Sequence, residues 1–240
     1  MNVQKKLMHD TQQLIDYGPV NIVIFGDSVS HGAFNGYIDY EKVYWNLLRK
    51  KLNQFRTYIP VNMICAAVGG TTAIQSLPRL DSQVLAHKPD LVIVCFGLND
   101  VNGPREDYLG ALECIFTKCK NAGSDVIFMT PNMLNTYVAD DTPQQHLNYA
   151  VKTAQAQISG RMDDYMSAAK ELAERLNVTV CDCYSKWKDI AKTEDTTLLL
   201  ANRINHPTPE MHELFAESLY EIIMSGTTSG AEDCSTMFSK

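Results

Sequence analysis

The chain has 240 residues, of which 45% are hydrophobic and 20% are charged, and its formal net charge is −7. This length suffices for one well-filled α/β core, and an acidic chain without a dense basic patch argues against a nucleic-acid partner. No apolar run approaches the ~20 residues that a membrane helix needs, and residues 1–17 lack the central apolar region of a secretory signal, so we expect a cytoplasmic protein without a membrane span.

Strands and helices are expected to alternate through the first half of the chain. An amphipathic lead-in over 1–18 precedes the run Ile22-Val23-Ile24-Phe25, whose β-branched and aromatic residues are typical of a strand buried on both faces. Further strands are expected over 58–68, 90–96 and 126–129. Apolar residues recurring at intervals of three and four predict helices over 40–52 and 106–121. A further helix is expected after the turn at 69–72, up to about residue 86.

The second half begins with a long polar segment over 133–159 without clear periodicity, which we interpret as a loop. A helix over 165–176, a strand over 178–184 and a helix over 208–224 follow. No linker or repeat divides the chain, so residues 1–224 are expected to form one domain. Residues 225–240 lack periodicity and are expected to be a flexible tail.

Five strands alternating with helices predict an α/β fold of three layers. The connections of such a parallel sheet are right-handed crossovers, which place helices on both of its faces. The carboxyl ends of the strands then meet at one edge, where ligands and chemistry are found in open α/β sheets.

Polar, glycine-containing turns follow three of these strands, over 26–28, 69–72 and 97–100. At this shared edge Ser28 is a candidate nucleophile. Gly70 can supply a backbone N–H and Asn99 a side-chain amide to a developing oxyanion, together with the N–H of Ser28 itself.

A serine nucleophile needs a base, and His206 is the best candidate. It stands in the loop before the last helix, where Pro207 and Pro209 restrict the backbone. No pair of the six histidines has convincing metal-ligand spacing, and the seven cysteines include no C-x-x-C pair. We therefore expect neither a metal nor an organic cofactor, and reduced thiols.

These turns give the chain a resemblance to the SGNH (GDSL-type) lipase/esterase hydrolases. The first family block is matched by F-G-D-S-V with Ser28, and the third block, G-x-N-D, is matched at Gly97 to Asp100. The second block, usually N-x-G-x-x-G, is matched in part, because C-A-A-V-G-G-T-T keeps Gly70 but has Cys65 and Ala67 at the other two positions.

The last family block usually reads D-x-x-H-P. His206 and Pro207 are present here, but Arg203 stands three residues before the histidine, where the family has aspartate. An imidazole base needs an acceptor at its other ring nitrogen, and arginine cannot accept a hydrogen bond. Three candidates for the acceptor remain open: the side-chain oxygen of Asn202, which is our first hypothesis, the carboxylate of Asp195, or a backbone carbonyl.

The resemblance implies a flavodoxin-like sheet of order 2-1-3-4-5 and a serine ester hydrolase that works through a Ser-His acyl-enzyme. The expected partner is a small acyl ester. No extended apolar segment is present to hold a fatty acid, so short acyl groups such as acetyl are favoured, and the polar residues of 133–159 suit an acylated carbohydrate. The alternatives are acyl transfer to a sugar or alcohol at the same site, and a non-catalytic doubly wound ligand-binding domain. The sequence gives no oligomeric state.

Overall fold

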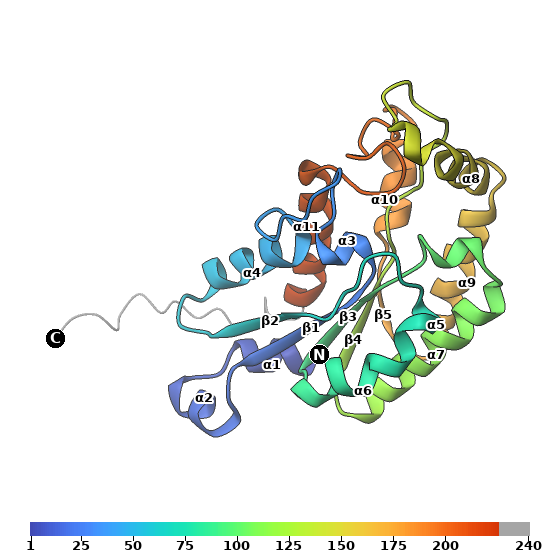
Figure 1. Ribbon diagram of the computed structural model, residues 1–240. Helices are drawn as coiled ribbons and strands as arrows, with labels where there is room; N and C mark the ends of the chain where they lie inside the picture. Colours follow the sequence, from blue (N-terminus) through green and yellow to red (C-terminus); the bar gives the residue numbers. More distant parts are fainter. Residues whose placement is uncertain (226–240) are drawn as a thin grey trace.

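The structure, a computed structural model, describes residues 1–225 and is built around a five-stranded sheet (Figure 1). All strands are parallel, and their order is β2-β1-β3-β4-β5, as predicted. The strands are β1 (Val20–Gly26), β2 (Val61–Cys65), β3 (Leu91–Cys95), β4 (Asp125–Met129) and β5 (Thr179–Cys181).

The sheet is deeply buried at its centre because helices cover both faces. Every residue of β3 is buried, as are six of the seven residues of β1. The β-branched and aromatic run predicted as the first strand therefore lies in the middle of the hydrophobic core, between β2 and β3. The carboxyl end of β1 is therefore held by β2 on one side and by β3 on the other.

Two helical layers enclose the sheet (Figure 1). In one, α4 (Tyr44–Phe55) packs against α11 (Pro209–Met224), which also contacts α10 (Cys183–Ile190). In the other, α7 (Arg105–Asn121) packs against α9 (Arg161–Arg175). The remaining α-helices are α1 (Asn2–Leu7), α2 (Thr11–Tyr17), α3 (Ser28–His31), α5 (Ala73–Ser76), α6 (Leu80–Gln83) and α8 (Leu147–Ile158). The 3₁₀ turns are η1 (Leu77–Arg79), η2 (Leu85–His87), η3 (Asp100–Asn102) and η4 (Gln144–His146).

The helix predicted over 72–86 is interrupted. The chain passes instead through four short pieces, α5, η1, α6 and η2. Pro78 lies in η1, and a proline within a helix removes a backbone donor and clashes with the preceding turn. A helical segment was expected here correctly, but the single helix is wrong, because Pro78 interrupts it.

The loop predicted over 133–159 is wrong for its second half, which forms α8. This helix was missed because its buried face carries small and polar side chains where large apolar ones are usual. Its buried residues are Ala150, Thr153, Ala154, Ala156 and Gln157. Thr153 donates to the Asn135 side chain at 2.6 Å, and the Gln157 side chain accepts from the Leu134 N–H at 2.9 Å, so the polar groups of this face are satisfied inside the fold.

The strand predicted over 178–184 is shorter than expected. It ends at Cys181, and α10 begins at Cys183. Asp182 starts this helix by accepting the Ser185 N–H at 3.1 Å, as an N-cap residue does. Cys183, Tyr184 and Trp187 are buried on one face of α10 and not along a strand.

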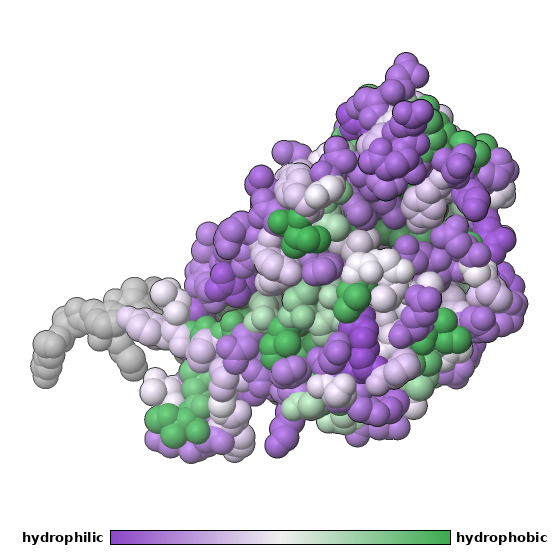
Figure 2. All heavy atoms as spheres, in the orientation of Figure 1, coloured by the Kyte–Doolittle hydropathy of each residue, from purple (hydrophilic) through white to green (hydrophobic). Residues whose placement is uncertain are grey.

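The amino-terminal residues pack against the strand starts at the lower edge of the sheet. The Val3 N–H donates to Asp125 at 2.8 Å, and Lys6 pairs with Asp90 at 2.9 Å. The next helix, α2, is more exposed, because its residues Ile15 and Tyr17 are 71% and 68% exposed. Figure 2 shows a hydrophobic patch at the lower left, where α2 lies.

Within residues 1–225, no helix combines the length and apolar character needed to cross a bilayer. The expected flexible tail lies outside the described residues, apart from Ser225.

Candidate active site

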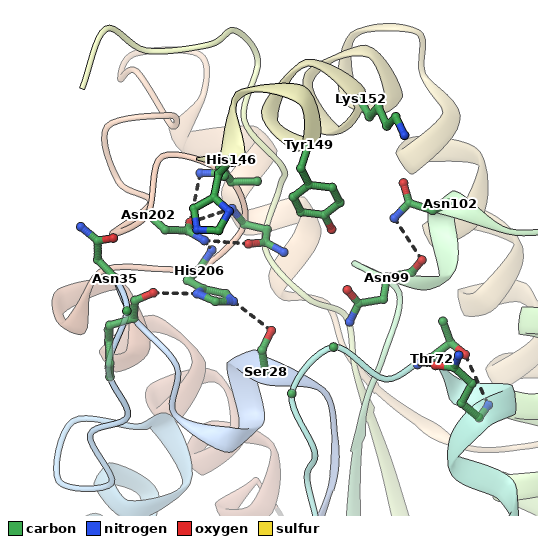
Figure 3. A pocket seen from close by; sticks show the side chains of 17 residues that line it. Ser28, Asn35, Thr72, Asn99, Asn102, His146, Tyr149, Lys152, Asn202 and His206 are labelled. Carbon is green, nitrogen blue, oxygen red and sulfur yellow. Dashed lines mark hydrogen bonds between the residues drawn. The ribbon is translucent and has the colours of Figure 1, made fainter. Parts of the chain in front are cut away.

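A cavity of about 750 Å³ opens at the carboxyl edge of the sheet (Figure 3). Ser28, Gly70, Asn99 and His206 all line it, so the structure brings the predicted site residues together. The other lining residues are Phe34, Asn35, Gly36, Gly69, Thr72, Gln75, Asn102, His146, Tyr149, Lys152, Asn202, Ile204 and Asn205.

Ser28 is the first residue of α3, directly after β1 and one capping residue. The Asp27 side chain accepts the Val29 N–H at 3.1 Å and so starts the helix. The preceding Gly26 leaves no room for a side chain, since a Cβ there would lie 2.4 Å from Ser30 Oγ and 2.6 Å from the Cys95 carbonyl oxygen. This tight turn leaves Ser28 only 7% exposed, at the floor of the cavity.

His206 lies between Ser28 and a backbone carbonyl (Figure 3). Its Nε2 is 3.0 Å from Ser28 Oγ, and its Nδ1 is 2.7 Å from the Phe34 carbonyl oxygen. Because a carbonyl oxygen only accepts, the ring proton belongs on Nδ1, which leaves the Nε2 lone pair facing the serine hydroxyl. The arrangement suits a neutral imidazole that takes a proton from Ser28.

The Phe34 carbonyl is itself firmly held. The Phe34 ring is buried, with its centroid 5.0 Å from that of His212. The backbone folds back on itself here, with the Phe34 N–H donating to the Tyr37 carbonyl at 3.0 Å and a bridge between Ala33 and Ile38. The acceptor for His206 is therefore part of a closed, anchored loop.

The hypothesis that the Asn202 side-chain oxygen bonds to the His206 ring differs from what is observed. That oxygen accepts three backbone N–H groups, those of Ile204, Asn205 and His206, each at 3.0 Å. Asparagine often closes local turns in this way, because its short side chain reaches the N–H groups that follow it. Asn202 thus fixes the loop that carries His206, while the His206 ring bonds to the Phe34 carbonyl.

Neither Arg203, at the family's aspartate position, nor Asp195, the charged candidate, bonds to the His206 ring. Arg203 has a φ of +60° and directs its guanidinium to Asp141, with Nε 2.9 Å from Oδ2. The Asp195 carboxylate accepts the Tyr137 hydroxyl at 2.7 Å and the Thr197 N–H at 3.0 Å. Of the three alternatives left open by the sequence, the backbone carbonyl matches the geometry.

Donors for an oxyanion face the cavity from three strand ends, those of β1, β2 and β3. Gly70 has a φ of +77°, and its N–H donates to no acceptor within the described residues. Asn99 uses one of its amide hydrogens on the Thr71 carbonyl at 3.1 Å and keeps the second free. The Ser28 N–H, at the first position of α3, has no partner within its helix. The Gly69 N–H, in contrast, donates to His31 Nδ1 at 3.3 Å.

Several lining residues were not singled out from the sequence, among them Phe34, His146, Tyr149 and Lys152. Phe34 contributes through its backbone, for which no residue-type signal exists. His146, Tyr149 and Lys152 lie at and just after the start of α8, and Figure 3 places Tyr149 across the cavity from Asn99. Tyr149 and Lys152 are three residues apart, so recognising α8 as a helix would have placed them on one face.

Burial determines the charge state of the site. It raises the pKa of Asp27 to about 7 and that of Asp100 to about 6, and the repulsion from Asp100 adds to the rise for Asp27. Burial also lowers the pKa of His206, with His146 acting in the same direction and the bond to the Phe34 carbonyl opposing it. His206 is therefore neutral at pH 7, as a general base must be.

Nowhere in residues 1–225 do three or more histidine, cysteine, aspartate or glutamate side chains gather closely enough to hold a metal ion.

Comparison with known proteins identifies the family. The model of the GDSL-like lipase/acylhydrolase family matches residues 24–214. The chain belongs to this family. It is accordingly a serine ester hydrolase, which sets aside the alternative of a non-catalytic binding domain.

Two curated relatives of this GDSL-like hydrolase cover much of the chain. An acetylxylan esterase of Geobacillus stearothermophilus is 22% identical over 170 residues, which are 66% of this chain and 70% of the relative. The uncharacterized lipoprotein YqeF of Bacillus subtilis is 25% identical over 233 residues, 87% of this chain and 90% of the relative.

Solved structures share the GDSL-type fold. Axe2, an acetylxylan esterase from Geobacillus stearothermophilus, aligns with a TM-score of 0.67 at 20% identity, over 85% of this chain and 94% of its own. LAE5, an α/β hydrolase enzyme from the metagenome of Lake Arreo, aligns with a TM-score of 0.68 at 19% identity, over 86% and 95% of the two chains.

One departure separates this chain from Axe2. Three catalytic mutants of Axe2 replace a serine, an aspartate and a histidine by alanine. In the present chain the residues between Asn202 and His206 are Arg203, Ile204 and Asn205, none of them acidic. This member of the GDSL-like family has a carbonyl oxygen at the histidine where a carboxylate is usual.

Proposed function

We propose that this GDSL-like hydrolase removes acetyl groups from carbohydrate alcohols through an acetyl-enzyme at Ser28. The observation that carries the mechanism is the 3.0 Å contact between His206 Nε2 and Ser28 Oγ, with His206 Nδ1 bonded to the Phe34 carbonyl. Nucleophile, base and orienting group then form a Ser-His dyad completed by the backbone.

In the first half of the reaction, Ser28 Oγ attacks the acetyl carbonyl carbon and its proton passes to His206 Nε2. The carbonyl oxygen becomes an oxyanion, which the N–H groups of Gly70 and Ser28 and the Asn99 amide stabilise. The intermediate collapses as the bond to the sugar oxygen breaks, and the imidazolium returns its proton to that oxygen. The alcohol leaves, and the acetyl group remains on Ser28.

In the second half, His206 takes a proton from water as the water attacks the acetyl-enzyme. The same donors hold the second oxyanion. Its collapse releases acetate and returns the proton from His206 to Ser28 Oγ. The positive charge that forms on His206 in each half has only the Phe34 carbonyl dipole to stabilise it, which supports the reaction less than a carboxylate does.

The acetyl and carbohydrate assignments rest on the cavity and on the relatives. Amide and hydroxyl side chains dominate the cavity lining, with Phe34 and Ile204 as large apolar members, so a sugar has many partners and a long acyl chain few. Two of the similar proteins are named acetylxylan esterases. We infer an acylated carbohydrate as the substrate class.

The proposal is tested with the purified chain and its Ser28→Ala variant. We expect release of acetate from acetylated xylo-oligosaccharides, faster hydrolysis of p-nitrophenyl acetate than of p-nitrophenyl dodecanoate, and a single fluorophosphonate label on Ser28. Loss of the catalytic serine should lower turnover by ~10⁴–10⁶. Labelling or hydrolysis that persists in Ser28→Ala contradicts the assignment, and a preference for the dodecanoyl ester contradicts the acetyl group.

Acyl transfer is separated from hydrolysis by adding a competing alcohol. Acetate as the main product in the presence of a sugar acceptor supports hydrolysis. Acetylated acceptor as the main product would reassign the site to transfer.

A further inference from the structure

The catalytic cavity has an unusual charge for this protein. The chain as a whole carries a net charge of −7, yet none of the residues lining the cavity is an aspartate or a glutamate. Apart from the half-buried His206, the lining side chains that can carry a positive charge are His146 and Lys152, both of them exposed. The nearest carboxyl groups named above, those of Asp27 and Asp100, are buried behind the lining.

A second cavity, of about 490 Å³, adjoins the first along α8. The two cavities share Asn102 and Lys152. Its further lining residues are Val101, Val151, Gln155, Ala156, Ser159 and Arg161, again without a carboxylate. Figure 3 shows Lys152 at the side of the catalytic cavity away from the Ser28–His206 pair, beyond Tyr149 and above Asn102.

Arg161 is fixed in position without losing its charge. Its Nε donates to the Val101 carbonyl and one terminal nitrogen donates to the Gly103 carbonyl, both at 2.7 Å. Backbone carbonyls orient a guanidinium but do not neutralise it. A fixed cation therefore borders the second cavity.

Lys152 is also uncompensated. Among the described residues its amine has no ion-pair partner, whereas most other lysines do, for example Lys188 with Asp163 at 2.8 Å. The helix that carries Lys152 contains no aspartate or glutamate over its whole length. Two cations without a carboxylate partner thus border one cavity, in a chain that pairs most of its other described lysines.

We propose that the cavity between Lys152 and Arg161 binds an anionic group, a carboxylate or a phosphate, on the alcohol part of the ester. The proposal rests on the proposed function, because it specifies the leaving group of the same reaction. The acetyl group sits at Ser28, and the sugar extends under Tyr149 toward α8. The preferred substrates are then acetyl esters of acidic sugars, such as uronic acids or sugar phosphates.

The test compares three acetyl esters of methyl glycosides that differ only in the group at carbon 6: an acetylated methyl glucoside, the matching acetylated methyl glucuronoside, and the matching acetylated methyl glucoside 6-phosphate. Exposed ion pairs are individually weak, so we expect one or both acidic esters to exceed the neutral one by roughly 3- to 10-fold in kcat/KM at low salt. The ratio should shrink in 0.5 M salt, where charges are strongly screened.

The variants assign this preference to the cavity. Lys152→Glu should lower the ratio of acidic to neutral kcat/KM to 1 or below, Lys152→Gln should lower it less, and Lys152→Arg should keep it. The matched control is Lys5→Glu, which makes the same charge change at an exposed lysine on α1 and should leave the ratio as it is.

The outcomes separate the two proposals. The rate on the neutral ester reports the proposed function, and only the ratio reports the anion site. A preference for the glucuronoside alone names a carboxylate as the ligand, and a preference for the sugar phosphate alone names a phosphate. Equal rates on all three esters, or a preference that survives Lys152→Glu, overturn the anion site while the esterase stands.

Discussion

The two partners of the proposed catalytic pair, Ser28 and His206, are held in place in opposite ways. Ser28 is fixed by its immediate neighbours, since β1 ends two residues before it and α3 begins with it. His206 lies in a loop, and its ring is oriented by a carbonyl 172 residues away in the chain. One partner depends on local sequence and the other on tertiary contacts.

The two sides of the site should therefore respond differently to substitution. The strand-held side, with Ser28, Gly70 and Asn99, moves only if the centre of the sheet moves. The loop-held side depends on the Asn202 side chain, which can be replaced without disturbing the core, and on the Phe34 carbonyl, which the buried Phe34 ring keeps in place. Substitutions on the two sides should therefore separate effects on stability from effects on turnover.

After Ser28→Ala, the largest effect on turnover is expected from Asn99→Ala, also on the strand-held side. Removing one oxyanion donor typically costs ~10²–10³ in kcat. Steady-state kinetics with p-nitrophenyl acetate measure this loss. A rise in KM with unchanged kcat would make Asn99 a residue that binds substrate equally in ground and transition states, and not an oxyanion donor.

Gly26→Ala is expected to damage both turnover and stability, because the added methyl group would meet Ser30 Oγ at 2.4 Å and the Cys95 carbonyl at 2.6 Å. Overpacking of this kind costs ~1–3 kcal/mol, and displacing the nucleophile by about 1 Å costs ~10² in rate. Thermal melting and kcat measure the two effects.

The matched control for Gly26→Ala is Gly110→Ala. Gly110 is exposed within α7, and a Cβ there meets nothing within 4 Å. Alanine is the better helix former by ~1 kcal/mol, so this variant should melt at the same or a higher temperature with normal turnover. If Gly26→Ala behaves like the control, the strand end is less rigid than its contacts indicate.

Asn202→Ala should lower kcat by about 10- to 100-fold with little change in melting temperature, because three N–H groups lose their acceptor and the loop carrying His206 loosens. Asn202→Asp keeps an acceptor and should recover part of the loss. Asp195→Ala, which contacts neither His206 nor Phe34 in the structure, serves as the control and should turn over normally. Full activity in Asn202→Ala would show that Phe34 alone suffices to place the ring.

The pH dependence of kcat/KM should reflect the loop-held side. Catalysis needs neutral His206, and burial lowers the pKa of this group from its ordinary value of 6.5. Activity should therefore persist as the pH falls below 6.5 and be lost only when the pH reaches the lowered pKa. An acidic limb centred above 6.5 would mean that the imidazolium is stabilised, as by a carboxylate partner.

A smaller effect should appear in stability, through His212 beneath the Phe34 ring. Burial lowers the pKa of His212 to about 3. At mildly acidic pH His212 is therefore protonated in the unfolded chain but stays neutral in the folded chain, where its ring packs on that of Phe34. Between pH 6.5 and pH 5 this one group should remove about 2 kcal/mol from the free energy of unfolding.

The variant for this measurement is His212→Asn, whose side-chain oxygen can still accept the Tyr44 N–H now bonded to His212 Nδ1. Denaturant unfolding at the two pH values should show a smaller pH dependence in the variant. An unchanged dependence would assign the acid sensitivity to other groups.

The sheet and its strand-end turns could be predicted because the information is local. A run such as residues 22–25 is apolar at every position, and the glycine that follows indicates where it ends. The same locality made Ser28 and Asn99 recognisable, and the structure brings both to one cavity. Parallel strand order then required only the family resemblance.

The loop-held side could not be predicted in the same way. The face of α8 that packs inward carries Thr153 and Gln157, whose partners become visible only in three dimensions. Asn202 lies near His206, as expected from the sequence, but its side-chain oxygen accepts backbone N–H groups of its own turn and does not bond to the ring. The Phe34 carbonyl has no signature in the sequence, because every residue carries the same main-chain carbonyl whatever its side chain.

That last property has a consequence for how such an enzyme can change over time. A catalytic aspartate is lost through a single nucleotide change, whereas no amino-acid replacement deletes a main-chain carbonyl. What natural variation can remove is only the anchoring of the Phe34 loop, through the ring that packs on His212. Drift in this lineage should consequently be recorded in paired changes at positions 34 and 212, and an alignment searched for an invariant acidic column would overlook the dyad altogether.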